Sequence, residues 1–160
     1  EVWWDVRPHP DFGTVELRMC DGITTLSEVS AVAALAQSLV AHLDALDDRG
    51  FTLPRHRDWI LRQNKWRAGR HGLDTDLIVD EHGRQEPIRQ AIADLVDEVS
   101  PTAARLGCSD ELAYVNRILE IGPSYERQRR VAPAAITRPS DLKPVVDSLV
   151  RELATDEPGA

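Results

Sequence analysis

The sequence predicts a mixed α+β fold, mostly helical, in which an antiparallel β-hairpin is followed by about five helices. One reason is that residues 2–7 and 14–20 alternate with the period of two that strands have, while the letters PHPDFG between them suit a connection. Another is that beyond Thr25 apolar residues return at helical spacing. The 160 residues, 42% of them hydrophobic, fit one compact domain at residues 1–155, and the tail at 156–160 is expected to be disordered.

The two strands of the hairpin are expected to have one apolar face and one charged face. Val15 and Leu17 point to the same side because alternate residues of a strand share a face, whereas Glu16 and Arg18 share the opposite side. Arg7 lies on the facing strand. The charged face therefore holds an acid beside a base.

The helix that follows is the most clearly marked element of the chain. Thr25 and Glu28 form a capping box at its start, and apolar residues recur at helical spacing until Gly50 closes it. Its longest apolar stretch, residues 29–40, is too short to span a bilayer, so no membrane segment is expected. Further helices are expected after Pro54, from Pro87, after a restart at Ser100-Pro101, from Ser109 and from Ser140.

Charge and cysteine content exclude some classes of partner and cofactor. The 27 acidic residues outnumber the 19 basic ones and give a net charge of -8, which repels phosphate backbones and anionic lipid. Nucleic acid and membranes are therefore not expected as partners. Cys20 and Cys108 lie far apart and lack metal-ligand spacing, which fits reduced thiols in a cytoplasmic protein.

Glu16 and Arg18 are the first candidates for chemistry, because they are two residues apart on a strand and project from the same face. A carboxylate on a strand can bind Mg²⁺, and a neighbouring guanidinium can hold phosphate oxygens, as phosphoryl transfer requires. A cross-strand ion pair on a solvated sheet face has the same pattern. On spacing alone both interpretations stay open.

The basic helix after Pro54 is a second candidate. Asn64 and Arg67 lie one turn apart on one face with further cations such as Arg70 around them, which suggests a site for nucleotide phosphate or a substrate carboxylate. The alternative is a solvated helix that pairs with acidic neighbours such as Asp74.

Two other groups of residues have a simpler interpretation. In the run SYERQRR at residues 124–130, Arg127, Gln128 and Arg129 could form a further anion site, but a basic surface patch is expected. The four tryptophans, Trp3, Trp4, Trp59 and Trp66, could stack on adenine, but we expect most of them to pack in the core.

Several segments of the chain resemble a known family. The run WWDVRPHPDFGTVELRMCD and the helix TLSEVSAVAALAQSLVAHL after it resemble the signature of type 2 glutamate–cysteine ligases, whose catalytic sheet is similar to that of glutamine synthetase. The segments NKWRAGRHGLD and SYERQRR also resemble parts of these carboxylate–amine ligases, in the same order. The chain is thus expected to be a fragment, the C-terminal part of a single ligase catalytic domain.

The resemblance implies an ATP-dependent ligase. It activates the γ-carboxylate of glutamate as an acyl phosphate, which the amine of cysteine, or another amine, then attacks. Glu16 is implied as a ligand of Mg²⁺ on the nucleotide phosphates, Arg18 as the cation that stabilises the transferred phosphoryl group, and Arg7 as a phosphate contact. The residues expected to bind ATP are Asn64, Arg67 and Arg70.

The same resemblance implies that this chain is incomplete as an enzyme. Further metal ligands and most of the glutamate pocket belong to the N-terminal part of a family member, so the chain alone is expected to have little activity. The alternative function is a non-catalytic binding or assembly module whose basic helix docks an acidic partner. An exposed hairpin edge also favours self-association, which leaves a homo-oligomer open.

Overall fold

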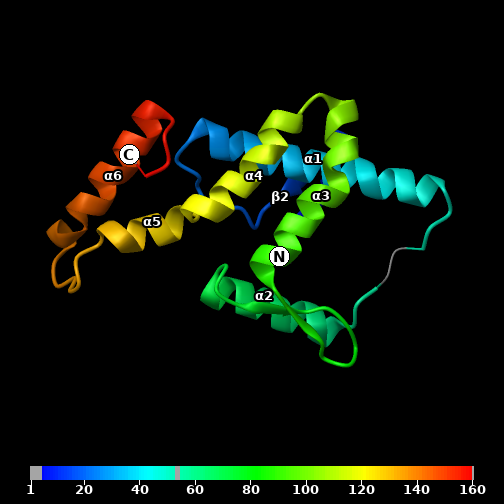
Figure 1. Cartoon of the computed structure of the whole chain (residues 1–160), viewed down its shortest axis with the longest axis horizontal. Helices are drawn as coiled ribbons and strands as arrows, with labels where there is room; N and C mark the ends of the chain where they lie inside the picture. Colours follow the sequence, from blue (N-terminus) through cyan, green and yellow to red (C-terminus); the bar gives the residue numbers. More distant parts are fainter. Residues whose placement is uncertain (1–4, 53–54, 160) are drawn as a thin grey trace.

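The computed structural model describes residues 5–52 and 55–159. Within these ranges the chain forms six α-helices, one short 3-10 helix and two separate two-stranded antiparallel sheets (Figure 1). The predicted α+β class with mostly helical content is confirmed, and the hairpin near the start of the chain is present.

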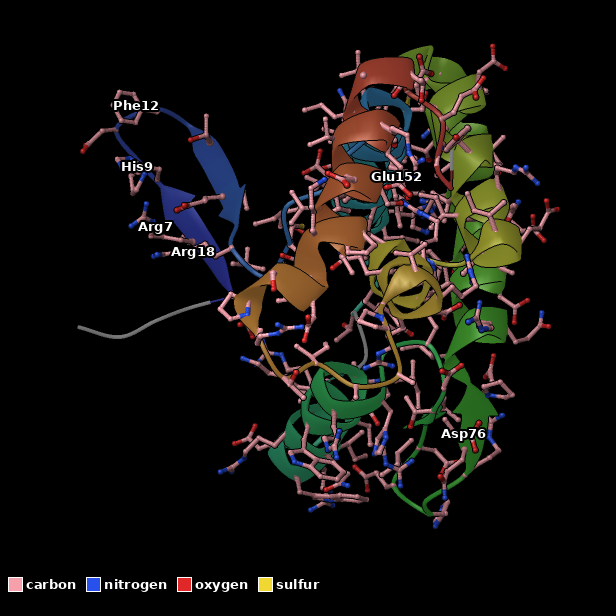
Figure 2. The ribbon with its side chains drawn as sticks, turned by 90° about the vertical axis from the view of Figure 1, so that its left-hand side faces the viewer. Arg7, His9, Phe12, Arg18, Asp76 and Glu152 are labelled. Atoms are coloured by element: carbon pink, nitrogen blue, oxygen red, sulfur yellow. The ribbon has the colours of Figure 1, made fainter. Side chains whose placement is uncertain are left out.

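The first hairpin joins β1 (Val6–His9) to β2 (Thr14–Leu17) and places Arg7 directly opposite Glu16. β2 ends at Leu17, earlier than predicted, and Leu17 pairs with Val6, the first residue of β1. Residues 2–4, expected to begin the first strand, lie outside the described residues. In Figure 2 the hairpin stands to one side of the helices.

α1 (Leu26–Asp48) begins as the capping pattern predicts. The backbone N–H of Glu28 donates to the hydroxyl of Thr25 at 3.3 Å, and that hydroxyl donates to the Glu28 carboxylate at 2.7 Å. The chain leaves the helix through Gly50, whose φ of 77° favours a residue without a side chain.

The main core lies where α1, α3 (Ile88–Leu106) and α4 (Ser109–Ile121) pack together. Its buried side chains are Ala31, Ala34, Val96, Val99, Ala103, Leu112 and Val115. Val29 and Val40 on α1 remain 44% and 54% exposed. The apolar side of α1 is therefore wider than the part that α3 and α4 cover.

α3 is one continuous helix, although a restart is predicted at Ser100-Pro101. Pro101 lies inside the helix, and the Ser100 hydroxyl donates to the carbonyl of Val96 at 2.7 Å. Burial on both sides of the proline, at Val99 and Thr102, supports the helix across this position. Tertiary packing thus overrides the local helix-breaking preference of proline.

α2 (Asp58–His71) is followed by a second hairpin, β3 (Asp76–Ile78) and β4 (Gln85–Pro87), which the sequence patterns do not predict. Strands of three residues are too short to show an alternation. The turn between them is closed by Asp80, whose side chain accepts the backbone N–H groups of His82 and Arg84 at 2.9 and 3.0 Å.

The C-terminal part contains α5 (Ser124–Val131), the 3-10 helix η1 (Pro139–Leu142) and α6 (Lys143–Thr155). Ser140, predicted as the cap of the last helix, lies inside η1. Asp156, in the expected tail, accepts the backbone N–H and hydroxyl of Ser27 at 3.0 and 2.6 Å, so the chain beyond α6 contacts the start of α1.

α1 also has the length and apolar composition of a membrane-spanning helix, and it is the only such helix among the described residues. The sequence argument considered only residues 29–40, whereas the helix continues to Asp48, so the argument from length is wrong. Length and composition do not separate a membrane span from a core helix, and Ala31 and Ala34 of α1 are buried against α3 and α4.

Candidate active site

The first hairpin brings three predicted site residues together. Because Arg7 and Glu16 are opposite each other across the ladder, their side chains meet at 2.5 Å between guanidinium and carboxylate. The Nε of Arg18 lies 3.8 Å from the other oxygen of Glu16. Figure 2 shows Arg7 and Arg18 on the hairpin, apart from the helical core. Two cations thus flank one carboxylate, as the strand alternation predicts.

This cluster is open to solvent. The side chains of Arg7, Glu16 and Arg18 are 47%, 44% and 25% exposed. An ion pair so exposed contributes only about 0–1 kcal/mol to folding, because water solvates the separated charges well. The pairing can therefore be exchanged for contacts with a charged ligand at little cost in stability.

Glu16 fits the requirements of a magnesium ligand that acts together with phosphate oxygens. Mg²⁺ keeps several waters and is commonly held by one or two carboxylates plus the phosphates of a substrate. Among residues 5–52 and 55–159 no group of three or more His, Cys, Asp or Glu side chains could hold a metal ion. Glu16 therefore supplies one carboxylate, and the described residues supply no complete protein cage.

The hairpin is connected to α2 through Asp5. Its carboxylate accepts two hydrogen bonds from the Nζ of Lys65, at 2.8 and 2.6 Å, and its carbonyl accepts the backbone N–H of Arg18 at 2.8 Å. Asp5 lies directly before β1, two residues from Arg7. The basic helix and the charged face of the hairpin are therefore neighbours.

The structure gives Asn64 and Arg67 of α2 partners within the fold. The side-chain amide of Asn64 donates to the carbonyl of Ile78 at 2.9 Å and accepts its N–H at 2.8 Å. Nη1 of Arg67 donates to the carbonyl of Asp76 at 2.8 Å and to the side chain of Gln85 at 2.6 Å. Both side chains thus fasten the second hairpin to α2, and their predicted contact with ATP stays a prediction.

The two tryptophans of α2 are exposed, whereas the sequence predicts core packing for most tryptophans. Trp59 and Trp66 are 46% and 59% exposed, so the expected core packing does not hold for these two. Trp3 and Trp4 lie outside the described residues. Arg70, the third predicted nucleotide contact, is exposed on the same helix. The reason is that α2 packs mainly through Ile60 and through its polar contacts with β3.

Arg127 is buried, although SYERQRR is predicted to be a surface patch. It is 4% exposed and lies between two carboxylates that are also buried, Glu28 and Glu152. Its Nη1 lies 2.8 Å from Glu28, and its Nε lies 2.9 Å from Glu152. The expectation is wrong here because the partners come from α1 and α6, so no local pattern reveals them. The start of α1, α5 and α6 meet at this cluster.

These contacts change the protonation behaviour of the cluster. Burial by itself raises the pKa of Glu152, but hydrogen bonds from Arg127, Thr24 and the backbone of Gly159 outweigh burial and hold that pKa below its usual value. For Arg127 burial acts to lower the pKa, and the bonds to Glu152 and Glu28 raise it overall. Arg127 and Glu152 are therefore charged at neutral pH.

A small hollow of about 260 Å³ lies just beyond β2, between the following loop and helices α1, α4 and α5. The loop contributes Cys20 and Asp21, and α5 contributes Tyr125. The Tyr125 hydroxyl accepts the N–H of Leu73 at 2.8 Å and donates to Glu126 at 3.1 Å. Its pKa is raised, first by burial and then by Glu126, so it remains a neutral donor at physiological pH.

Comparison with known proteins identifies the family. The sequence profile of glutamate-cysteine ligase family 2 matches residues 1–150. A protein of Frankia alni named as a candidate glutamate–cysteine ligase 2-1 is 52% identical over 158 residues, which cover 99% of this chain and 41% of that protein. A similarly named protein of Thermobifida fusca is 51% identical, with 99% and 39% covered. The chain spans about two fifths of the length of these relatives. It belongs to glutamate–cysteine ligase family 2, which confirms the resemblance seen in the sequence.

Proposed function

We propose that this chain contributes the phosphoryl-transfer side of an ATP-dependent ligase that joins the γ-carboxylate of glutamate to the amine of cysteine. The observation that carries the proposal is the cluster of Arg7, Glu16 and Arg18, in which one exposed carboxylate lies between two guanidinium groups. Family membership supports the reaction class. The names of the relatives support glutamate and cysteine as the substrates.

The proposed reaction has two steps. The substrate carboxylate attacks the γ-phosphorus of ATP, the bond to the bridging oxygen breaks, and ADP leaves while an acyl phosphate forms. The amine then attacks the acyl carbon, inorganic phosphate leaves, and the amine loses a proton to solvent. Mg²⁺, when bound, neutralises charge on the β- and γ-phosphates.

The residues of the hairpin have separate tasks in this scheme. Glu16 supplies a carboxylate to the metal, and Arg18 holds the oxygens of the transferred phosphoryl group in a planar fork. Arg7 contacts phosphate from the facing strand. If Glu16 held the metal, its ion pair with Arg7 would be released, and the guanidinium group of Arg7 would be available to phosphate oxygens.

The chain is proposed to act as part of a longer polypeptide. It spans about two fifths of its relatives, and a single carboxylate holds Mg²⁺ weakly. Other metal ligands and the glutamate pocket would come from the remaining three fifths. We therefore expect the chain alone to release little ADP.

The test uses a chimera in which the N-terminal part of the Frankia alni relative precedes this chain. ADP release is measured with ATP, Mg²⁺, glutamate and cysteine, for the chimera and for its Glu16→Gln variant. We expect the variant to lose roughly two to three orders of magnitude in kcat, the typical effect of removing one preorganised charge contact. Thermal unfolding of both proteins shows that the fold is retained.

Glu120→Gln is the matched control, since Glu120 also forms an exposed ion pair, with Arg117 at 3.2 Å. It should leave ADP release unchanged. Equal ADP release by the chimera and its Glu16→Gln variant would show that catalysis does not require Glu16. Absence of ADP release from a folded chimera with every amine tried would favour the assembly module, for which charge reversal at Arg62 should abolish binding of an acidic partner.

A further inference from the structure

One face of α2 carries a tryptophan between two arginines. Arg62, Trp66 and Arg70 are four residues apart, so they form a stripe along one side of the helix. The indole ring of Trp66 is held from one edge by the ring of His71, with 5.7 Å between centroids. A shallow hollow of about 490 Å³ on this face is lined by Arg62, Lys65, Trp66, Gly69 and Arg70.

The charges of this hollow are not neutralised by the part of the chain that the structure describes. Arg62 and Arg70 have no hydrogen bond or ion pair with another described residue, whereas Arg67 is bound to the second hairpin. Two guanidinium groups without a partner among the described residues thus lie beside an indole that is 59% exposed. They suit a ligand that has both negative charge and a flat aromatic surface.

Gly69 keeps the floor of the hollow open. It is a glycine inside a helix, where glycine lowers stability relative to alanine. Nothing lies within 4 Å of the position that a Cβ would take, and its φ is not in the left-handed region. Neither the backbone nor packing within the described chain therefore requires glycine here, and a side chain would fill the space next to Trp66.

We propose that this hollow binds a purine nucleotide, with its base stacked on Trp66 and its phosphates held by Arg62 and Arg70. Stacking on an aromatic ring is a common way for a protein to bind a base, because every base has a flat π-face. The two arginines lie about 12 Å apart along the helix axis, from the rise per residue, so both can reach one nucleotide bound at Trp66. The net charge of -8 repels a long polyanion such as nucleic acid, so a mononucleotide is the better ligand for this hollow.

The hollow lies beside the candidate active site. Lys65, which lines it, is bound to Asp5 at the base of the hairpin, two residues before Arg7. The hollow and the hairpin are thus joined by the ion pair of Lys65 with Asp5. The inference rests on the proposed function for the identity of the nucleotide as ATP, and it assigns the base to a face of α2 different from that of Asn64 and Arg67.

The inference is tested by NMR titration of the chain Glu1–Ala160 with Mg²⁺ and ATP at millimolar concentration. The indole N–H resonance of Trp66 is assigned from a Trp66→Phe variant. We expect this resonance to shift with ATP and with adenosine, and much less with inorganic tripolyphosphate. Gly69→Leu and the pair Arg62→Gln with Arg70→Gln should each raise the Kd for ATP about tenfold or more.

Arg117→Gln is the control, because it removes an exposed arginine on α4 and should leave the Kd unchanged. If ATP shifts resonances of the hairpin but not the indole resonance of Trp66, this inference is overturned, and the proposed ligase function is not affected. Equal shifts with ATP and tripolyphosphate, or none at all, would also overturn it. A responsive Trp66 together with an inactive chimera would keep the nucleotide site and contradict the ligase.

Discussion

At the scale of single residues, the hairpin site can be predicted from the sequence, whereas the buried cluster around Arg127 cannot. Glu16 and Arg18 can be placed on one face from their spacing alone, because strand alternation is a local rule. Arg127 cannot be placed in this way, since its partners Glu28 and Glu152 are 99 and 25 residues away. Only the folded chain brings these charges together.

The first prediction at this scale concerns Arg127→Ala. The substitution leaves Glu28 and Glu152 buried without their cation, and breaking a buried ion pair in this way costs about 3–5 kcal/mol. Urea unfolding measures the loss. Arg117→Ala, which breaks an exposed pair, should cost about 0–1 kcal/mol. Similar losses for both variants would show that the cluster does not stabilise the fold as described.

The second prediction concerns acid stability. The pKa of Glu152 is lower in the folded chain than its unfolded value of about 4.3, so the unfolded chain takes up the proton first as the pH falls. Glu152 therefore stabilises the fold above about pH 4.3, and this contribution is lost as the pH falls through the lowered pKa. Urea midpoints measured across this range should fall more steeply for the natural chain than for Glu152→Gln. Parallel curves would contradict the assignment.

At the scale of elements, local signals give the first hairpin and α1, and they fail where the tertiary structure decides. The strand alternation and the capping box of Thr25 and Glu28 lie within short stretches of sequence. The second hairpin has strands of three residues, so its position depends on the side chains of α2 that hold it. α3 continues through Pro101 because burial on both sides outweighs the lost backbone bond.

The prediction for this scale is that Asn64 controls the second hairpin. Asn64→Ala removes two hydrogen bonds to Ile78 and leaves a half-buried backbone pair unsatisfied, which we expect to cost about 2 kcal/mol. Hydrogen exchange of the amide groups in β3 and β4 should become faster, while exchange in α1 and α4 should not change. Gln63→Ala on the same helix is the control. Unchanged exchange in β3 would contradict the proposal that Asn64 holds the second hairpin on α2.

At the scale of the whole molecule, the hairpin and α1 leave an apolar gap between them. A hollow of about 560 Å³ separates Val15 and Leu17 of the hairpin from Ala36 and Val40 of α1. The strand β2 also has an unpaired edge within the described sheet. Exposed apolar strands with open edges favour association with other chains.

We therefore predict that the chain associates with itself in a concentration-dependent manner. Val15, 53% exposed, lies on the apolar side of β2, so Val15→Lys should reduce association by placing a charge there. Sedimentation velocity at several concentrations measures the effect. Thr14→Lys, next to it on the opposite face, is the control for added charge. A monomer at every concentration would contradict the prediction.

The cluster of Arg127 also decides how the chain can be shortened. The family profile ends at residue 150, whereas Glu152 lies two residues beyond it. A recombinant protein trimmed to the profile boundary would lose one of the two carboxylates that neutralise Arg127, together with the acceptor for Gly159. The end of the profile match and the limit of the folded part are thus different in this protein, and an expression boundary chosen from the former would remove one of the most deeply buried charges among the described residues.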